Sequence, residues 1–263
     1  MSAMAKPRLA VFKLASCDGC QLTLLDLEDE LLLLADALDI VHFPEAGPIA
    51  AYDQRFELAL VEGSVSTAEQ REELLGIRAR AAKLITIGAC ATAGGVQALR
   101  NFQDHDALAR IVYARPDYVA SLADSTPVAA HVPVDFELRG CPIAKHQLLE
   151  LIAAMLVGRR PDIADESVCM ECKRSGQVCV MVTGDQACLG PITHAGCGAL
   201  CPTFARGCFG CFGPKEQANT PALAQHLHVV QGRSREAIVR AHRLITGWAA
   251  AFRAESERWE THE

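Results

Sequence analysis

The chain has 263 residues, of which 50% are hydrophobic and 22% charged, and its formal net charge is −7. A chain of this length can bury one substantial core, or a core and a smaller module, without disulfides. The negative charge argues against a general nucleic-acid binder, which would present a basic face. The longest apolar runs are interrupted by acidic residues before they reach membrane-spanning length, so no membrane association is expected.

The N-terminal sequence MSAMAKPRLAVFKL has no apolar signal core, no cleavage site and no twin-arginine pair. A cytoplasmic protein is therefore expected. Thiols stay reduced in that compartment, and Cys-x-x-Cys spacing then favours metal binding over a disulfide. The chain has 12 cysteines, which is three sets of four.

Residues 1–160 alternate short apolar runs with amphipathic segments, a pattern typical of parallel βα units. The predicted strands are 8–14, 39–43, 57–63, 83–88 and a strand near 128–134. The predicted helices are 21–38, 67–81 and 144–158, with Thr67 as the N-cap of the second. The sequence therefore predicts an α/β domain built on a parallel sheet.

Residues 161–263 differ in composition. After a linker at 159–167, the segment 169–214 is rich in Cys, Gly and Pro and has no long periodic run. Such a segment cannot build much apolar core, so metal ligation is expected to hold it together. One or two helices are predicted over 221–230 and 235–259.

Four cysteines are placed by this scheme at the carboxyl ends of the predicted strands. Cys17 and Cys20 follow the first strand, Cys90 follows the strand 83–88, and Cys141 opens the helix 144–158. Loops from different strands converge at that edge of a parallel sheet. Four thiolates converging there can hold one cubane iron–sulfur cluster.

Other interpretations of these cysteines stay open from the residues alone. Cys90 or Cys141, taken singly, can be a small buried hydrophobe, and Cys17 with Cys20 can be a redox pair. The glycines of GACATAGG can form a tight turn or a phosphate loop. In the segment 169–214, spacing alone does not separate a Cys₄ zinc site from an iron–sulfur site.

Seven motifs resemble those of the small, electron-transferring subunit of nickel–iron (NiFe) hydrogenases, over nearly the whole chain. They are SCDGCQ at 16–21, VEGSV at 61–65, GACATAGG at 88–95, GCP at 140–142, ECKRSGQVC at 171–179, CLGP at 188–191 and GCFGCFGP at 207–214. The all-cysteine second half is most similar to the cytosolic branch of the sulfhydrogenase delta subunit type.

This resemblance implies a flavodoxin-like domain over 1–160 and an iron–sulfur domain over 161–263, with little regular structure and C-terminal helices. It implies three [4Fe-4S] clusters, whose ligands follow position by position. The matching positions are Cys17, Cys20, Cys90 and Cys141 for the proximal cluster, Cys197, Cys208 and Cys211 for the medial cluster, and Cys172, Cys179 and Cys188 for the distal cluster. Cys201 is expected to complete the medial set and Cys169 the distal set.

Three departures from the family pattern refine this expectation. Cys169 stands where periplasmic members have a histidine, which implies an all-cysteine distal cluster. Cys201 stands where they have a proline beside a [3Fe-4S] cluster, which implies a medial [4Fe-4S] cluster. Oxygen-tolerant members have an extra cysteine at the position of Gly19, so the glycine implies an ordinary proximal cubane.

The resemblance implies electron relay between the NiFe site of a large subunit and iron–sulfur/flavin NAD(P)-reductase subunits, in H₂ oxidation or proton reduction. The chain lacks the paired Cys-x-x-Cys nickel ligands of the large subunit, so it is not expected to be catalytic alone. The NiFe centre, flavin and NAD(P) are expected on partner subunits. Alternatives are an F420- or heterodisulfide-reductase-linked hydrogenase small subunit and a zinc-stapled scaffold.

A quinone-linked subunit of the respiratory-complex type is disfavoured, since that family has adjacent cysteines near its first ligands and lacks the eight-cysteine segment. Two further residues are candidates. Glu62 ends a predicted strand near the edge where the first cluster is expected. It is a candidate proton or interface contact, and the alternative is a simple polar residue at the end of a strand. His194 lies between Cys188 and Cys197 and is predicted to be a neighbour of the ligands or a surface residue.

Overall fold

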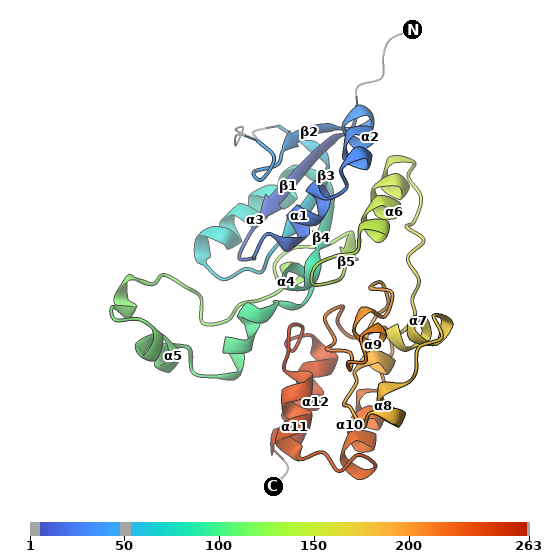
Figure 1. Ribbon diagram of the computed structural model, residues 1–263. Helices are drawn as coiled ribbons and strands as arrows, with labels where there is room; N and C mark the ends of the chain where they lie inside the picture. Colours follow the sequence, from blue (N-terminus) through green and yellow to red (C-terminus); the bar gives the residue numbers. More distant parts are fainter. Residues whose placement is uncertain (1–5, 48–53, 262–263) are drawn as a thin grey trace.

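The computed structural model describes residues 6–47 and 54–261, and in these ranges it has one five-stranded sheet (Figure 1). Its strands are β1 (Arg8–Lys13), β2 (Asp39–His42), β3 (Phe56–Glu62), β4 (Ala81–Ile87) and β5 (Phe136–Leu138). They all run parallel, in the order β2-β1-β3-β4-β5. This is the order of flavodoxin-like doubly wound sheets, so the expected fold class is confirmed.

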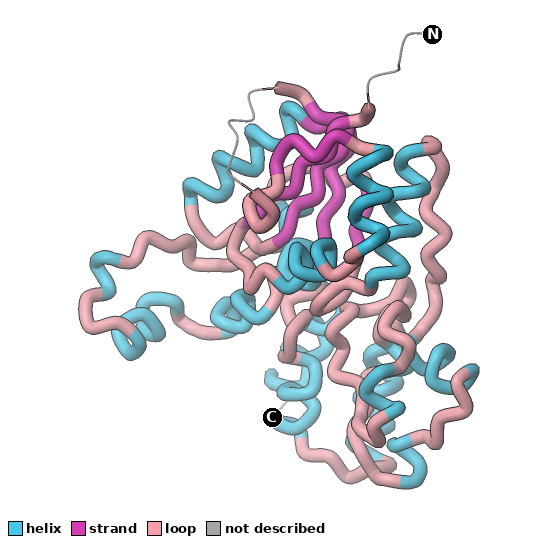
Figure 2. Tube along the Cα trace, turned by 45° about the horizontal axis from the view of Figure 1, so that its top comes forward, coloured by secondary structure: helices cyan, strands magenta, loops and turns pink. Residues whose placement is uncertain are grey.

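Each face of the sheet buries its own apolar cluster, because successive side chains of a strand point to opposite faces. On β1, Leu9 and Val11 belong to one cluster, whereas Ala10 and Phe12 belong to the other. Helices cover both faces (Figure 2). The first cluster takes side chains from α1 (Gly19–Leu25) and α6 (Lys145–Leu156), and the second takes them from α3 (Ala68–Arg80) and α4 (Gly88–Ala93).

Helix α3 begins at the predicted N-cap. The Thr67 hydroxyl accepts a hydrogen bond from the Gln70 N–H at 3.2 Å, and the Gln70 side chain accepts one from the Thr67 N–H at 3.2 Å. This reciprocal pair is a capping box, which satisfies two amide groups that the helix leaves without partners. Leu74 and Ile77 then bury the inner face of the helix against the sheet.

The single helix predicted over 21–38 is wrong, because the segment forms α1 and a separate helix, α2 (Asp29–Ala37). Between them, Glu28 has a φ of 53°, outside the right-handed helical region. The turn brings Leu27 into the first core cluster and leaves α2 without a buried side chain. Leu24 and Leu27 keep helical spacing across the turn, so apolar periodicity did not reveal the break.

The strand predicted near 128–134 is also wrong, because the fifth strand is β5. The predicted segment contains instead a short 3₁₀ helix, η3 (Val128–Ala130), whose Val128 is buried in the second cluster. Pro127 and Pro133 flank it, and proline has no N–H for a sheet ladder. The buried valines produced a strand-like apolar pattern in a segment that packs as a loop.

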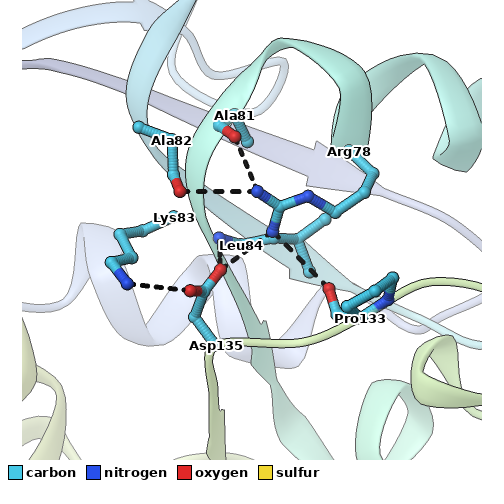
Figure 3. A network of polar contacts seen from close by, with 7 residues as sticks. All are labelled: Arg78, Ala81, Ala82, Lys83, Leu84, Pro133 and Asp135. Atoms are coloured by element: carbon cyan, nitrogen blue, oxygen red, sulfur yellow. Dashed lines mark hydrogen bonds and ion pairs between the residues drawn. The ribbon is translucent and has the colours of Figure 1, made fainter.

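Asp135 determines where β5 begins (Figure 3). Its N–H donates to the carbonyl of Leu84 at 2.8 Å, and its carboxylate accepts from the Leu84 N–H at 2.9 Å. Arg78 and Lys83 pair with the same carboxylate at 2.8 and 2.9 Å. These contacts join the start of β5 to β4 and to the end of α3.

Between β4 and β5 the chain leaves the sheet in a long excursion. Its helices are η1 (Val96–Phe102), α5 (His105–Val112) and η2 (Pro116–Tyr118), and α5 lies well away from the sheet (Figure 1). The Asn101 side chain closes the base of the excursion, since it donates to the Ser125 carbonyl and accepts from the Ser125 N–H, at 2.8 and 2.9 Å.

The Cys-rich module contains only short helices joined by irregular segments. They are α7 (Val168–Arg174), α8 (Val180–Thr183), η4 (Gly190–Ile192) and α9 (Leu200–Thr203). The module has a small buried cluster formed by Val168, Val180, Cys188, Ala199 and Cys208. Two of these five residues are cysteines, so thiols are part of its interior.

The C-terminal part has three helices where one or two were predicted: α10 (Thr220–Val229), α11 (Arg235–His242) and α12 (Ala250–Thr261). The break between α11 and α12 is a close turn, in which a Cβ on Gly247 would lie 2.8 Å from the Arg243 Cα. Phe252 packs with Leu189 and Ile192 and so joins these helices to the module. Across 6–47 and 54–261, none of the helices is both long and apolar enough to cross a membrane.

Candidate metal centres

The first candidate centre lies at the carboxyl edge of the sheet. Cys17 and Cys20 follow β1, Cys90 lies in α4 directly after β4, and Cys141 follows β5. Burial, then Glu62, then Cys90 and Cys141 raise the pKa of the Cys20 thiol. Burial also raises the pKa of Cys90 and of Cys141, and Cys17 adds to both effects. The structure therefore brings these four predicted ligands together.

Two glycines of the GACATAGG motif leave space for these sulfurs. A Cβ on Gly88 would lie 2.4 Å from the Cys20 Sγ, and a Cβ on Gly95 would lie 2.6 Å from the Cys90 Sγ. Their φ angles are 88° and 66°, a region that favours glycine. Of the two interpretations of this motif, the geometry supports a tight turn, packed against thiols.

Glu62 ends β3 beside this centre and holds the loop that carries Cys20. Its carboxylate accepts hydrogen bonds from the N–H groups of Cys20 and Gln21, at 3.1 and 3.2 Å. The residue is only 2% exposed, and burial raises the pKa of its carboxyl group. These contacts give Glu62 a positioning role in the first centre.

Gln97 is a neighbour of this centre that the sequence reasoning missed. Its Nε2 donates to the Ala15 carbonyl at 2.6 Å, and its Oε1 lies 3.5 Å from the Cys90 Sγ. The side chain thus joins the loop after β1 to the helix that carries Cys90. The one sequence feature that pointed to Gln97 was its position two residues after the GACATAGG motif. A single glutamine forms no spacing pattern with other ligands, so the sequence did not identify it.

The second candidate centre lies in the Cys-rich module, where four cysteines line one small cavity. They are Cys169, Cys172, Cys179 and Cys188. Burial raises the pKa of the Cys172 thiol, and the other three thiols raise it further. Cys179 is exposed and Cys188 is buried, so this group extends from the surface into the module. These are the four residues predicted for the distal cluster.

The third group lies between the other two and consists of Cys197, Cys201, Cys208 and Cys211. Burial raises the pKa of Cys211, and the contributing thiols include Cys197 and Cys201 of its own group and Cys141 of the first centre. Burial likewise raises the pKa of Cys208, with contributions from Cys188 of the second centre and from Cys211. Cys208 therefore lies near Cys188 of the second centre, and Cys211 lies near Cys141 of the first.

The chemistry of these groups fits metal binding. All twelve cysteines are free thiols. Burial raises the pKa of Cys90 to about 11 and the pKa of Cys208 and Cys211 to about 12, so their thiolates need nearby positive charge at neutral pH. The Cys208 N–H also donates to the Cys188 Sγ at 3.2 Å, a kind of contact that tunes iron–sulfur centres.

The histidines take other partners. The Nδ1 of His194 lies 2.8 Å from the Ala195 carbonyl, and its Nε2 lies 3.9 Å from a Glu216 oxygen. His42 stacks on Phe12 with ring centroids 4.8 Å apart. These contacts are compatible with the prediction that His194 is a neighbour of the cluster ligands or a surface residue.

Comparisons with known proteins identify the family. Residues 17–155 match the family described as the 20 Kd subunit of NADH ubiquinone oxidoreductase. Sulfhydrogenase 2 subunit delta of Pyrococcus furiosus is 36% identical over 241 residues, which cover 92% of this chain and 100% of that protein. A subunit of the F420-non-reducing hydrogenase vhu of Methanococcus voltae is 29% identical, with 83% of this chain and 89% of that protein covered.

A solved structure of a NAD⁺-reducing [NiFe]-hydrogenase in the H₂-reduced state contains a chain that is 30% identical to this one. The TM-score is 0.56, and the match covers 61% of this chain and 96% of that chain. The family match includes strands β2 to β5 and all four strand-end cysteines, and the sulfhydrogenase match extends over most of the chain. The chain therefore belongs to the family of the NADH ubiquinone oxidoreductase 20 Kd subunit and, within it, to the hydrogenase subunits of the sulfhydrogenase delta type.

Proposed function

We propose that this chain relays electrons through three [4Fe-4S] clusters, between the NiFe site of a large subunit and a NAD(P)-linked flavin partner, in a cytoplasmic hydrogenase. One observation carries the proposal: four thiols gather at the sheet edge, four line a cavity in the Cys-rich module, and each of these two groups has one exposed cysteine. Cys17 and Cys179 are exposed, and the other ten cysteines are buried or partly buried. An arrangement of this kind suits transfer between two partner proteins.

The residues that would hold each cluster follow from the grouping. Cys17, Cys20, Cys90 and Cys141 would hold the proximal cluster, Cys197, Cys201, Cys208 and Cys211 the medial one, and Cys169, Cys172, Cys179 and Cys188 the distal one. When bound, such clusters supply one-electron transfer, at potentials set by burial, charge and hydrogen bonds to sulfur. The chain provides these influences through buried thiols and through the amide of Cys208.

The junctions between the groups support the order of the relay. Burial raises the pKa of Cys211 and Cys141 adds to it, and burial raises the pKa of Cys208 and Cys188 adds to it. These effects, and the hydrogen bond from the Cys208 N–H to the Cys188 Sγ, support a medial group between the other two. The strand-end group would face the large subunit, and the group around exposed Cys179 would face the flavin partner.

A heterodisulfide-reductase- or F420-linked acceptor is the second candidate. The relatives include a subunit of a hydrogenase that does not reduce F420, matched over 83% of this chain, and the gamma subunit of a coenzyme F420 hydrogenase, matched over 57%. Purifying the native complex and identifying its other chains decides between these acceptors. A flavin subunit with a NAD(P) site supports the first, and a heterodisulfide-reductase or F420-binding subunit supports the second.

Metal analysis tests the number and type of centres. Three quartets imply roughly twelve iron and twelve acid-labile sulfide per chain, at four of each per cluster. Anaerobically reconstituted protein that holds zinc, or only four iron atoms, would contradict the relay.

Cys201→Pro should convert the medial cluster towards a [3Fe-4S] form with an EPR signal in the oxidised state, and an unchanged spectrum would exclude Cys201 as a ligand.

Two cysteine variants of the assembled complex test the order. Cys17→Ser should impair electron exit from the NiFe site and weaken binding of the large subunit. Cys169→Ser should leave the complex assembled and slow transfer to the acceptor, while hydrogen–deuterium exchange at the active site, which needs no net electron flow, persists. Loss of that exchange in an intact Cys169→Ser complex would reverse the proposed order.

A further inference from the structure

A second type of metal-binding group lies away from the thiols, at the junction of the sheet and the Cys-rich module. Asp165, His194 and Glu216 each offer one ligand atom, and these atoms all lie within 4.8 Å of one another. The three side chains line a cavity of about 230 Å³, together with Arg139 and Arg160. None of them takes part in the proposed electron relay.

Backbone hydrogen bonds hold the three chain segments side by side. The N–H of His194 donates to the Gly213 carbonyl at 2.9 Å, and the N–H of Ala195 donates to the Glu166 carbonyl at 2.8 Å. Isolated bridges join Ser167 to His194 and Thr193 to Pro214. The main chain therefore brings the three residues together.

The imidazole of His194 is oriented as a metal ligand. Its Nδ1 lies 2.8 Å from the Ala195 carbonyl, which can only accept, so Nδ1 carries the proton. In the neutral ring, Nε2 then has a free lone pair, and it faces the Glu216 Oε2 at 3.9 Å. Metal-binding histidines usually donate their other N–H to a carbonyl or carboxylate in this manner.

The two carboxylates need a cation or a proton between them. Arg139 lies 3.1 Å from the Glu216 Oε1, which leaves Oε2 turned towards His194. The pKa of Asp165 is raised, mainly by its contact with Glu216. Two carboxylates at such close range resist ionising together unless positive charge lies near them. Arg139 supplies part of that charge to Glu216, Lys215 and His194 act against the rise in the pKa of Asp165, and a bound metal ion would add to them.

We propose that Asp165, His194 and Glu216 bind one divalent first-row metal ion, with water in the remaining coordination positions. One imidazole and two carboxylates suit ions such as Mn²⁺ and Zn²⁺. The ion would join the linker, the segment before Cys197 and the turn after Cys211. Its role is structural: it fixes the linker that follows the sheet domain against the Cys-rich module, and it carries no electrons.

The test uses the full-length, cluster-loaded chain with its clusters oxidised and Mn²⁺ as the probe. Mn²⁺ prefers oxygen and nitrogen ligands, so it does not compete for the thiolates. Loss of the free Mn²⁺ EPR signal during titration should show about one bound ion per chain. Pulsed EPR should detect coupling to an imidazole nitrogen. His194→Gln and Asp165→Asn should each weaken binding by more than about tenfold, and His194→Gln should abolish the coupling.

His105→Gln is the matched control, because His105 and Asp106 form a similar histidine–carboxylate pair at 3.2 Å outside the three-ligand group. It should bind Mn²⁺ as the wild type does. Iron content and far-UV circular dichroism show whether each variant is folded. If His194→Gln loses its clusters, the test rests on Asp165→Asn, because Asp165 is exposed and its substitution should leave the fold intact. Wild-type protein without stoichiometric Mn²⁺, or with binding unchanged in both variants, would overturn the proposal.

Discussion

The sheet domain and the Cys-rich module have very different interiors. The sheet buries an apolar cluster on each face, with side chains from its strands and from four of the helices. The module buries a cluster of five residues, and two of them, Cys188 and Cys208, are cysteines. Because apolar burial contributes only about 25 cal/mol per Å², the module gains little from it. Side-chain packing therefore stabilises the first region, whereas the proposed function makes the second depend on the clusters that its thiols would bind.

Removing metal should produce the largest difference between the two regions. Treatment with an iron chelator under reducing conditions should raise amide hydrogen exchange throughout the module, since metal binding and folding are coupled in such segments. Strands β1, β3 and β4 should remain protected by their ladders and their apolar clusters. Exchange measured by mass spectrometry checks this, and equal loss of protection in both regions would contradict the comparison.

Gly207→Ala should damage the module and spare the sheet. A Cβ on Gly207 would lie 1.9 Å from the Ala187 carbonyl oxygen, so the backbone beside Cys188 and Cys208 must move. We expect loss of roughly four to eight iron atoms, the content of one or two clusters. Gly76→Ala is the control, because the nearest atom to its added Cβ would be the Arg80 Nη1 at 3.6 Å. Full iron content in Gly207→Ala would show that the turn tolerates a side chain.

Leu74→Ala should weaken the sheet domain by about 2–5 kcal/mol, the usual cost of deleting a buried leucine side chain. Leu74 is fully buried under the sheet, whereas its neighbour Leu75 is 49% exposed. Leu75→Ala should therefore change the free energy of unfolding by less than about 0.5 kcal/mol. Urea denaturation followed by circular dichroism measures both. A Leu74→Ala variant as stable as Leu75→Ala would refute the assigned packing.

Thr67→Ala should have the smallest effect, about 1 kcal/mol, because it removes the hydroxyl that caps α3. Ser234→Ala removes the corresponding cap of α11, where the serine oxygen accepts from the Ala237 N–H at 3.3 Å. Hydrogen exchange should rise in α3 for the first variant and in α11 for the second, with iron content unchanged in both. A loss of iron in Thr67→Ala would show that the two regions are more strongly coupled than proposed.

Local sequence patterns were sufficient for the elements that depend on neighbouring residues. Alternating or continuous apolar runs predicted β1 to β4, and Thr67 predicted the start of α3, because strand pairing and capping use residues close together in the chain. The cysteines after β1, β4 and β5 were placed at one edge for the same reason, since parallel strands end at a common edge.

Contacts between distant segments followed from the packing of the whole chain. The pairing of Asp135 with Leu84 sets the start of β5, and the burial of Leu27 breaks the predicted helix. The approach of Asp165, His194 and Glu216 likewise depends on how three segments pack. Spacing along the chain carries no information on such contacts, because they arise from which distant surfaces the folded chain brings together. Residue types and local patterns were enough to predict strands β1 to β4 and the gathering of cysteines at the sheet edge, whereas packing specified which side chains meet.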